Sequence, residues 1–181
     1  MTEIDFRILD FIREKLSNGF FDFVMPKLTA VGNVGFIWIF IAAAMVVSRK
    51  YRRNGLELAA GLVGCALVGN LLLKNLIARQ RPCWINDTIE LLIAVPKDYS
   101  FPSGHTMASF AAAAIILHAN KRLGIAAYIL AAVIAFSRLY LYVHFPTDVL
   151  AGAVIGTVIG IAVCFFSKKF FPQKELHDAE K

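Results

Sequence analysis

The sequence predicts an all-α fold, an integral membrane bundle of five strong transmembrane helices preceded by an N-terminal interfacial helix. Hydrophobic residues make up 58% of the chain and charged residues only 18%, and the mean hydropathy of +0.63 lies above the range of soluble domains. The apolar residues also form stretches of membrane-spanning length between short, basic loops. We expect a single domain over residues 1–181, with an amphipathic segment (1–30), a transmembrane bundle (31–167) and a cytoplasmic tail (168–181).

The first element is predicted to be an amphipathic helix that ends at Asn18-Gly19. Apolar residues recur on one side from Ile4 to Leu16 with charged residues opposite, as in helices that lie in a membrane interface. Residues 20–25 could extend it into a weak sixth span, which would put the N-terminus in the cytoplasm. The charges that interrupt the segment argue against a cleaved signal peptide. Pro26 then opens or kinks the next segment.

Five apolar stretches are long enough to cross a hydrocarbon core of about 30 Å, which takes about 20 helical residues. The third stretch is short, and the fourth carries Ser137 and Arg138 near its far end. A charge that deep in a membrane is unfavourable unless it faces the protein interior. The expected spans lie near residues 31–48, 56–77, 104–119, 123–143 and 148–167.

The basic residues predict the orientation of the bundle. They gather in the loop 48–55, in Lys121-Arg122 and in the tail after Ser167, and the positive-inside rule puts these three segments in the cytoplasm. This topology explains the net charge of +6, so no nucleic-acid partner is expected. The polar clusters at the other ends of the spans then share the extracytoplasmic face. We expect a multi-pass protein of the cell (inner or cytoplasmic) membrane, in contact with the lipid bilayer.

A first polar cluster lies where the second span reaches the membrane surface. Lys74 and Arg81 are seven residues apart, close to two helical turns, so both can project from one face of a helix that Pro82 ends. Arginine offers a planar fork for phosphate oxygens, and lysine adds a compact charge. Arg79 falls off this face and is expected to be a loop or headgroup contact. An ordinary pair of interfacial cations is the alternative.

A second cluster, Pro102-Ser103-Gly104-His105, opens the third span directly after a turn. The first amides and the positive end of that helix would face the site, as at helix termini that bind anions. Ser103 can donate its hydroxyl, Gly104 lets the backbone approach a phosphate oxygen, and His105 would point into the same space. A serine N-cap with an incidental histidine is the alternative.

The third cluster runs from Ser137 to Asp148. His144 and Asp148 are one helical turn apart, so the carboxylate can fix the tautomer and orientation of the imidazole and leave the opposite ring nitrogen free to attack. Arg138 adds a third cation from within the span, where an arginine needs a partner and a bound phosphate would serve. A buried histidine capped by its neighbour is the alternative.

The sequence gives no sign of a metal site or of a disulfide framework. Cys65 and Cys164 fall inside apolar stretches and Cys83 lies in a loop, and none of them has metal-ligand spacing. We therefore expect no metal and no cofactor.

The three clusters together resemble the signature of the type-2 phosphatidic acid phosphatase superfamily. The stretch that carries the resemblance covers under half of the chain, and the flanking spans also fit the helical bundle of that family. All motif positions match in order and in membrane context: Lys74-x6-Arg81-Pro82, Pro102-Ser103-Gly104-His105, and Ser137-Arg138-x5-His144-x3-Asp148.

The resemblance implies a metal-independent phosphatase that works through a phosphohistidine. His144 would be the nucleophile, Asp148 would orient it, and His105 would protonate the leaving oxygen and then activate water. The other motif residues would bind the phosphate: Lys74, Arg81, Ser103, Gly104 and Arg138.

The partner implied by the resemblance is a membrane lipid phosphate as substrate. Undecaprenyl pyrophosphate, phosphatidylglycerol phosphate and phosphatidic acid all fit, and the first two are preferred because similar short bacterial proteins often carry those activities. Residues 83–101 link the first two motifs and are expected to roof the site and to influence headgroup choice. A lipid transporter or flippase that binds headgroups without chemistry is the rival interpretation. The sequence leaves the oligomeric state open.

Overall fold

A computed structural model describes residues 2–170 of the chain, which are largely helical and contain no strand, so the predicted all-α class is confirmed. Residues 168–170 of the expected tail belong to the last helix, which ends at Phe170, and the rest of the tail lies outside the described residues. The elements follow in the order α1 (Thr2–Leu16), α2 (Gly19–Val31), the 3-10 helix η1 (Asn33–Gly35), α3 (Phe36–Val47), α4 (Arg52–Cys65), the π-helix η2 (Ala66–Leu73), α5 (Lys74–Ile77), α6 (Pro82–Ile85), α7 (Gly104–Ala119), α8 (Lys121–Tyr140) and α9 (Pro146–Phe170).

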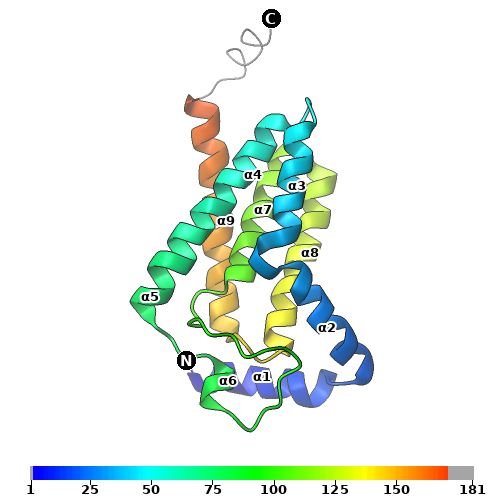
Figure 1. Cartoon of the computed structure of the whole chain (residues 1–181), viewed down its shortest axis with the longest axis vertical. Helices are drawn as coiled ribbons and strands as arrows, with labels where there is room; N and C mark the ends of the chain where they lie inside the picture. The colour runs from blue at the N-terminus through cyan, green and yellow to red at the C-terminus, as the bar shows by residue number, and fades with distance from the viewer. Residues whose placement is uncertain (1, 171–181) are drawn as a thin grey trace, which may run out of the picture.

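The helices α3, α4, α7, α8 and α9 run along the long axis of the molecule, with α7 among them (Figure 1). α7 packs against α9, α8 and α4. α1 lies across the lower end of the bundle, and α2 slants upward from it to α3 (Figure 1). The long axis therefore has one end crossed by α1 and an opposite end formed by the turns between α3 and α4 and between α7 and α8.

α9 approaches α7 closely because it presents a stripe of glycines to it. Gly152, Gly156 and Gly160 recur at every fourth position and are all buried. A Cβ on Gly156 would lie 2.1 Å from the carbonyl oxygen of Met107, and one on Gly160 would lie 2.7 Å from that of Ala111. Small residues at such spacing let membrane helices approach backbone to backbone. This contact fixes the start of α9 beside the start of α7.

Three helical stretches of the described residues are long and apolar enough to cross a membrane: Arg52–Ile85, Lys121–Tyr140 and Pro146–Phe170. α2 and α3, bent by 46° at η1, would count as a fourth if they form one span. α7 is apolar but has only 16 residues. The predicted helical membrane bundle is therefore confirmed, and the number of five spans remains a prediction.

The expected first span, 31–48, is not one continuous helix. The chain breaks at Gly32–Gly35, where Gly35 has φ +71°, and the helix before the break starts at Gly19. Asn18 caps that helix by accepting hydrogen bonds from the amides of Phe20 and Phe21. Pro26 lies inside α2 rather than at its opening.

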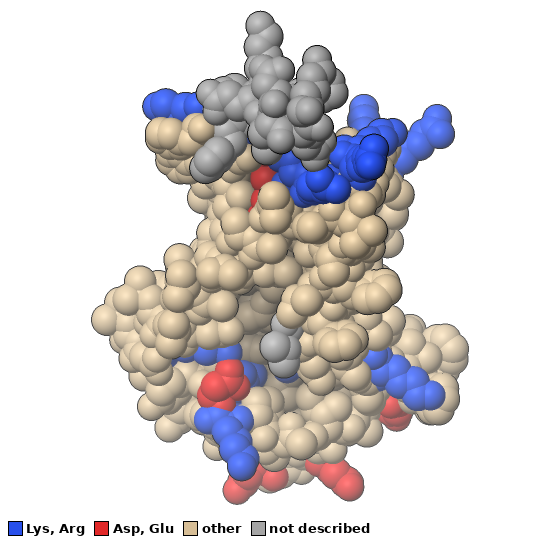
Figure 2. All heavy atoms as spheres, turned by 45° about the horizontal axis from the view of Figure 1, so that its top comes forward, with Lys and Arg blue, Asp and Glu red and all other residues tan. Residues whose placement is uncertain are grey.

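Charged residues are separated by a wide uncharged band, which suits the hydrocarbon core (Figure 2). Lysine and arginine gather at the end formed by the turn after α3 and the end of α9, while acidic and basic residues mix at the end crossed by α1. α1 exposes Ile4, Ile8 and Phe11 and buries Leu9, as an interfacial helix does. It also buries Asp5, which is 2% exposed and lies one turn before Leu9, so the buried side of this helix contains a carboxylate.

Candidate active site

The three polar clusters meet at the end of the bundle that α1 crosses. They border a cavity of about 610 Å³ between α2, η2, the loop after α6 and the start of α7. Two of the eight predicted site residues, Ser103 and Asp148, are fully buried outside its lining. The other six line the cavity: Lys74, Arg81, Gly104, His105, Arg138 and His144.

The chain between Lys74 and Arg81 does not follow the expected helix. α5 ends at Ile77, and Ala78 adopts a left-handed conformation with φ 47°, which no continuing α-helix has. Arg81 is in extended backbone just before α6, so Pro82 opens a helix instead of ending one. The prediction that both cations share one helix face was wrong, although both side chains reach the same cavity.

Arg81 is buried beside His144 and fixes its tautomer. Nη1 of Arg81 donates to the carbonyl oxygen of Val143 at 2.7 Å and lies 3.1 Å from Nε2 of His144. Its Nε and Nη2 donate to the main-chain oxygen and a side-chain oxygen of Asp98, each at 2.7 Å. A guanidinium has only donors, so Nε2 of His144 must accept and the ring hydrogen lies on Nδ1.

This tautomer directs the Nε2 lone pair of His144 toward the cations. The side chain is almost fully buried. Burial lowers the pKa of His144 well below its usual range, and the positive charges of the nearby arginines and lysine lower it further. The imidazole is therefore neutral near pH 7, which is the form that can act as a nucleophile.

The other ring nitrogen of His144 faces Asp148 by way of a serine. Nδ1 lies 3.7 Å from Oδ2 of Asp148, too far for a direct hydrogen bond, and 3.4 Å from Oγ of Ser100. Ser100 donates to Oδ2 of Asp148 at 2.5 Å, and the amide of Phe145 donates to the same oxygen at 2.9 Å. The sequence placed Asp148 beside the imidazole but missed Ser100, which immediately precedes Phe101-Pro102.

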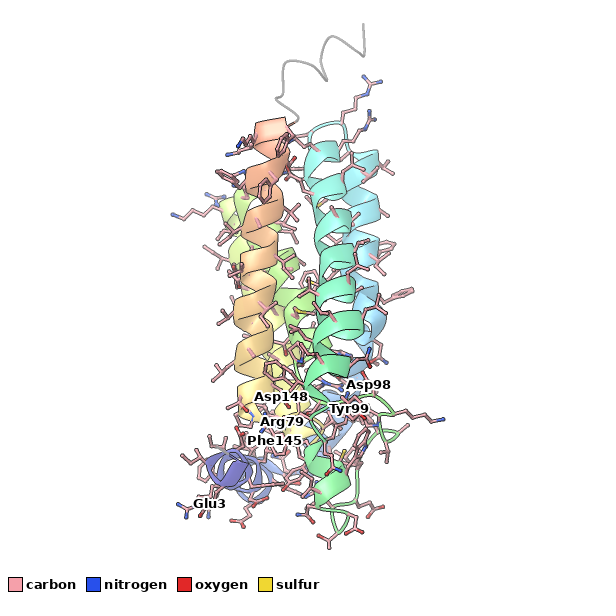
Figure 3. The ribbon with its side chains drawn as sticks, turned by 90° about the vertical axis from the view of Figure 1, so that its left-hand side faces the viewer. Glu3, Arg79, Asp98, Tyr99, Phe145 and Asp148 are labelled. Atoms are coloured by element: carbon pink, nitrogen blue, oxygen red, sulfur yellow. The ribbon has the colours of Figure 1, made fainter. Side chains whose placement is uncertain are left out.

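Arg79 is part of this arrangement, contrary to the expected loop or headgroup contact. Its Nη1 donates to Oδ1 of Asp148 at 2.6 Å, and its Nη2 donates to Oδ2 of Asp5 at 2.8 Å. Figure 3 shows Arg79 and Asp148 together at the foot of α9, next to α1. The expectation failed because the left-handed turn at Ala78 redirects the chain toward α9.

His105 and Gly104 form the opposite wall of the cavity at the start of α7. Oδ1 of Asn33 lies 2.9 Å from Nε2 of His105 and can only accept, so Nε2 carries a hydrogen and Nδ1 is left to exchange a proton. A Cβ on Gly104 would lie 3.1 Å from Oδ1 of Asn70 in η2, so the glycine permits this close approach. The motif spacing gave no sign of Asn33 or Asn70.

Ser103 occupies the N-cap position of α7 but makes no side-chain capping bond, so the ordinary N-cap interpretation does not hold. Its Oγ instead accepts a hydrogen bond from Thr106 at 2.9 Å. Its amide donates to the carbonyl oxygen of Asp148 at 3.2 Å. Ser103 therefore links the start of α7 to the start of α9 from outside the cavity lining.

Arg138 supplies a buried cation with an unused donor. The side chain is 4% exposed, and its Nη1 donates to the hydroxyl of Thr29. Within residues 2–170 its Nε has no hydrogen-bond partner. A buried donor without an acceptor is unfavourable, so an anion in the cavity would stabilise this arrangement.

Asp98, from the loop after α6, pairs with two cations of the cavity. Its carboxylate contacts Nζ of Lys74 and Nη2 of Arg81, and its side chain is 54% exposed. Burial raises the pKa of Asp98, but the hydrogen bond from Lys74 and the charges of both cations outweigh it and lower the pKa to about 2. The loop predicted to roof the site thus places an anion on the same cations that were predicted to bind phosphate.

The site combines groups for binding and for chemistry. No group of three or more histidine, cysteine or acidic side chains is placed as metal ligands would be in the part of the chain that the structure describes. The cavity instead offers three cations, an imidazole nitrogen with a free lone pair and a second imidazole that can exchange a proton. Such a set can hold an anion, attack it and protonate a leaving group.

Comparison with known proteins gives consistent relationships. The PAP2 superfamily pattern matches residues 54–172. The undecaprenyl-diphosphatase of Sulfolobus acidocaldarius is 33% identical over 125 residues, 68% of this chain, and the chain spans only 60% of that protein. Undecaprenyl-diphosphatase BcrC of Bacillus subtilis is 31% identical over 160 residues, which cover 88% of this chain and 81% of that protein. The solved PAP2 type phosphatidylglycerolphosphate phosphatase of Bacillus subtilis has a TM-score of 0.77 at 28% identity, covering 95% of this chain and 88% of that one.

Proposed function

This chain belongs to the PAP2 superfamily, and from that premise we propose that it is a membrane lipid phosphatase. The observation that carries the proposal is the composition of the cavity. One part of its lining consists of cations and two histidines, while another part is formed by apolar residues of α4 and α7 such as Leu62 and Met107. Leu62 precedes Lys74 by about three helical turns, so the apolar wall extends toward the middle of the bilayer. A phosphate head with an apolar tail matches both parts.

Phosphate binding would use the cations that now pair with protein groups. Lys74 and Arg81 would exchange the Asp98 carboxylate for phosphate oxygens, and Nε of Arg138 would gain its missing acceptor. The amides at the start of α7 add the positive end of a helix dipole. When Arg81 turns to the phosphate, it releases Nε2 of His144.

The chemistry would proceed in two steps through a phosphohistidine. The first step starts with His105 protonated on both ring nitrogens beside the bound phosphate. The Nε2 lone pair of His144 bonds to phosphorus, the bond to the lipid oxygen breaks, and Nδ1 of His105 gives that oxygen its proton. In the second, water attacks the phosphorus, its proton passes to His105, and the bond to Nε2 breaks to release phosphate. His144 and His105 end as they began, and no metal takes part in either step.

The substrate class follows from the relatives together with the cavity. Both undecaprenyl-diphosphatases named above act on a polyprenyl diphosphate, and the solved relative acts on phosphatidylglycerol phosphate. We propose a polyprenyl diphosphate first and phosphatidylglycerol phosphate second. We also propose that the active site lies on the extracytoplasmic side of the cell membrane, and the basic residues at the end opposite the cavity support this orientation.

Phosphate release by the purified protein in detergent tests the proposal. The protein should release phosphate from undecaprenyl pyrophosphate, from phosphatidylglycerol phosphate or from both, and EDTA should leave the rate unchanged. Strong inhibition by EDTA would contradict the metal-free steps. Headgroup movement across vesicles without phosphate release would favour the transporter over the phosphatase.

A further inference from the structure

Arg79 occupies one of the unspecified positions between Lys74 and Arg81 of the first motif, yet its side chain joins three segments of the chain. Besides Asp148 and Asp5, its Nη1 donates to Oγ1 of Thr147 at 2.7 Å. Asp5 in turn accepts from the amide and the hydroxyl of Thr147, at 3.2 and 2.9 Å. One guanidinium thus connects α1, the turn before α6 and the start of α9. Figure 3 shows Arg79 between Phe145 and Asp148, close to α1.

We propose that Arg79, held by Asp5 of α1, is a positioning residue that fixes the Asp148 carboxylate and through it the imidazole of His144. The inference rests on the proposed phosphatase function, because it assigns Arg79 a part in orienting the nucleophile. Arg79 is not among the residues that line the cavity, so it acts on the phosphate only through other groups.

Arg79 controls both oxygens of the carboxylate. Its side chain donates to Oδ1 of Asp148. Its carbonyl oxygen accepts a 2.8 Å hydrogen bond from the amide of Ser100, and Ser100 donates through its hydroxyl to Oδ2. Nδ1 of His144 lies closer to Oγ of Ser100 than to Oδ2 of Asp148. A shift of Arg79 would therefore move the imidazole in two ways, through the Asp148 carboxylate and through Ser100.

Arg79 also supplies the charge that a buried carboxylate needs. Asp148 is fully buried, and an unpaired charge there would be strongly unfavourable. The guanidinium stacks on the ring of Phe145, 4.1 Å from its centroid, which limits its movement. Its two terminal nitrogens serve Asp148 and Asp5 separately, and the single ammonium group of a lysine does not reproduce that fork.

α1 completes the arrangement from the membrane interface. Asp5 is 2% exposed and lies one helical turn before Leu9, on the buried side of the helix. Leu9, on the same helix, is buried against Tyr142 and Phe145 of the segment that carries His144. The face of α1 opposite the lipid therefore holds the second partner of Arg79 in place.

Steady-state kinetics on Arg79→Gln tests the inference. We expect kcat to fall on the order of tenfold to a hundredfold, as small misplacements of reacting groups do. KM and inhibition by orthovanadate, a phosphate analogue, should stay within about threefold, because the cations of the cavity are untouched. The matched control is Arg13→Gln, which removes a hydrogen bond from α1 to the carbonyl of Glu90 without touching Asp148. That variant should keep kcat within about twofold.

Two further variants separate positioning from folding. Arg79→Lys keeps a charge near Asp148 and should recover part of the lost kcat. Arg79→Gln combined with Asp148→Asn should be no slower than Asp148→Asn alone, because both changes remove the same interaction. Multiplicative losses in the double variant, or equal kcat in Arg79→Gln and Arg13→Gln, would overturn the inference.

The same assay separates failure of this inference from failure of the proposed function. An unmodified protein that releases phosphate, together with an inactive His144→Ala, upholds the phosphatase while Arg79 is judged on its own variants. An unmodified protein that hydrolyses none of the lipids would overturn both. If Arg79→Gln lowers kcat, orthovanadate affinity and thermal stability to the same degree, the role of Arg79 is structural and not one of positioning.

Discussion

The two histidines of the cavity are held in very different ways. His144 is almost fully buried, with Arg81 on one ring nitrogen and the pair Ser100 and Asp148 on the other. His105 is partly exposed, and its Nε2 faces the side chain of Asn33. One half of the site is therefore fixed by a chain of hydrogen bonds, and the other half borders open space.

The difference suits two different tasks. A nucleophile must present its lone pair to phosphorus along one line, so it gains from rigid partners that need no reorganisation during the reaction. A proton donor must reach a leaving oxygen whose position depends on the lipid attached to it. The half that holds His144 is thus suited to the phosphate, which all proposed substrates share, and the half with His105 to the part that varies.

The largest effect should come from removing the fixed imidazole. His144→Gln should abolish turnover, with a loss of about a thousandfold or more, because it removes the nitrogen lone pair that attacks phosphorus. An acid-labile, base-stable phosphoryl adduct should form on the unmodified protein and be missing from the variant. Orthovanadate should still bind the variant, since the cations remain. Substantial turnover by His144→Gln would exclude His144 as the nucleophile.

Removing the second imidazole should have a smaller effect that depends on the leaving group. His105→Asn should lower kcat on lipid substrates by about a hundredfold or more, the usual contribution of a general acid or base. With 2,4-dinitrophenyl phosphate, whose leaving oxygen needs no proton, the loss in the first step should be much smaller. A burst of dinitrophenolate followed by slow turnover is the expected signature. An equal loss in burst rate on both substrates would contradict the assignment of His105 as the acid.

The helical framework could be predicted from the sequence because it depends on local composition. The expected span 104–119 coincides with α7, and 123–143 differs from α8 (Lys121–Tyr140) by only a few residues. The break between α2 and α3 was not predictable, because it depends on a tertiary contact. A Cβ on Gly32 would lie 3.0 Å from Cδ2 of His105, so a larger residue would be crowded by a helix far along the chain.

The motif residues that line the cavity were predictable from their spacing, but Asn33 and Asn70, which also line it, and the residues behind them were not. Arg79 and Ser100 act through a left-handed turn at Ala78 and a main-chain hydrogen bond, neither of which leaves a periodic pattern. The burial of Asp5 was not predictable either, because acidic residues of an interfacial helix usually face water. Its burial depends on Arg79, which approaches it from a distant part of the chain.

Asp98 offers a way to change the open half without touching either histidine. Asp98→Asn leaves the cations of Lys74 and Arg81 without their carboxylate partner. Inorganic phosphate and orthovanadate should therefore inhibit severalfold more tightly. Because the Asp98 side chain is half exposed, the gain in binding free energy should be about 1 kcal/mol or less. Glu90→Gln, on the same loop, is the control and should change neither constant. Inhibition constants equal to those of the unmodified protein would show that Asp98 does not compete with the phosphate.

The pH dependence of this competition has a definite sign. The pKa of Asp98 is lowered to about 2, so its ion pairs are fully present above the ordinary carboxylate range and are lost only as the pH falls toward 2. Asp98 should therefore stay ionised throughout the range in which the enzyme is assayed. The ratio of inhibition constants between Asp98→Asn and the unmodified protein should be constant from pH 5 to pH 8. The titration of phosphate itself changes both constants equally and therefore cancels in this ratio.

The smallest effect should come from weakening the attachment of α1 to the fixed half. Tyr142 precedes His144 in a left-handed conformation with φ 58°, and its hydroxyl donates to Asp10 of α1 at 2.7 Å. Tyr142→Phe removes that hydrogen bond and should lower the unfolding free energy by about 1 kcal/mol, seen as a slightly lower melting temperature. Tyr140→Phe is a matched control, because it removes a 2.6 Å bond to Asp22 of α2.

The pair of tyrosine variants decides whether α1 acts through one contact or several. Asp148 keeps Arg79 and Ser100 in Tyr142→Phe, so kcat should fall by no more than about twofold, as in Tyr140→Phe. A tenfold loss confined to Tyr142→Phe would mean that the docking of α1 is itself coupled to the orientation of His144. The orientation of His144 would then depend on the whole of α1. A change in the lipid that contacts the exposed Ile4, Ile8 and Phe11 should in that case alter kcat as strongly as a substitution in the active site.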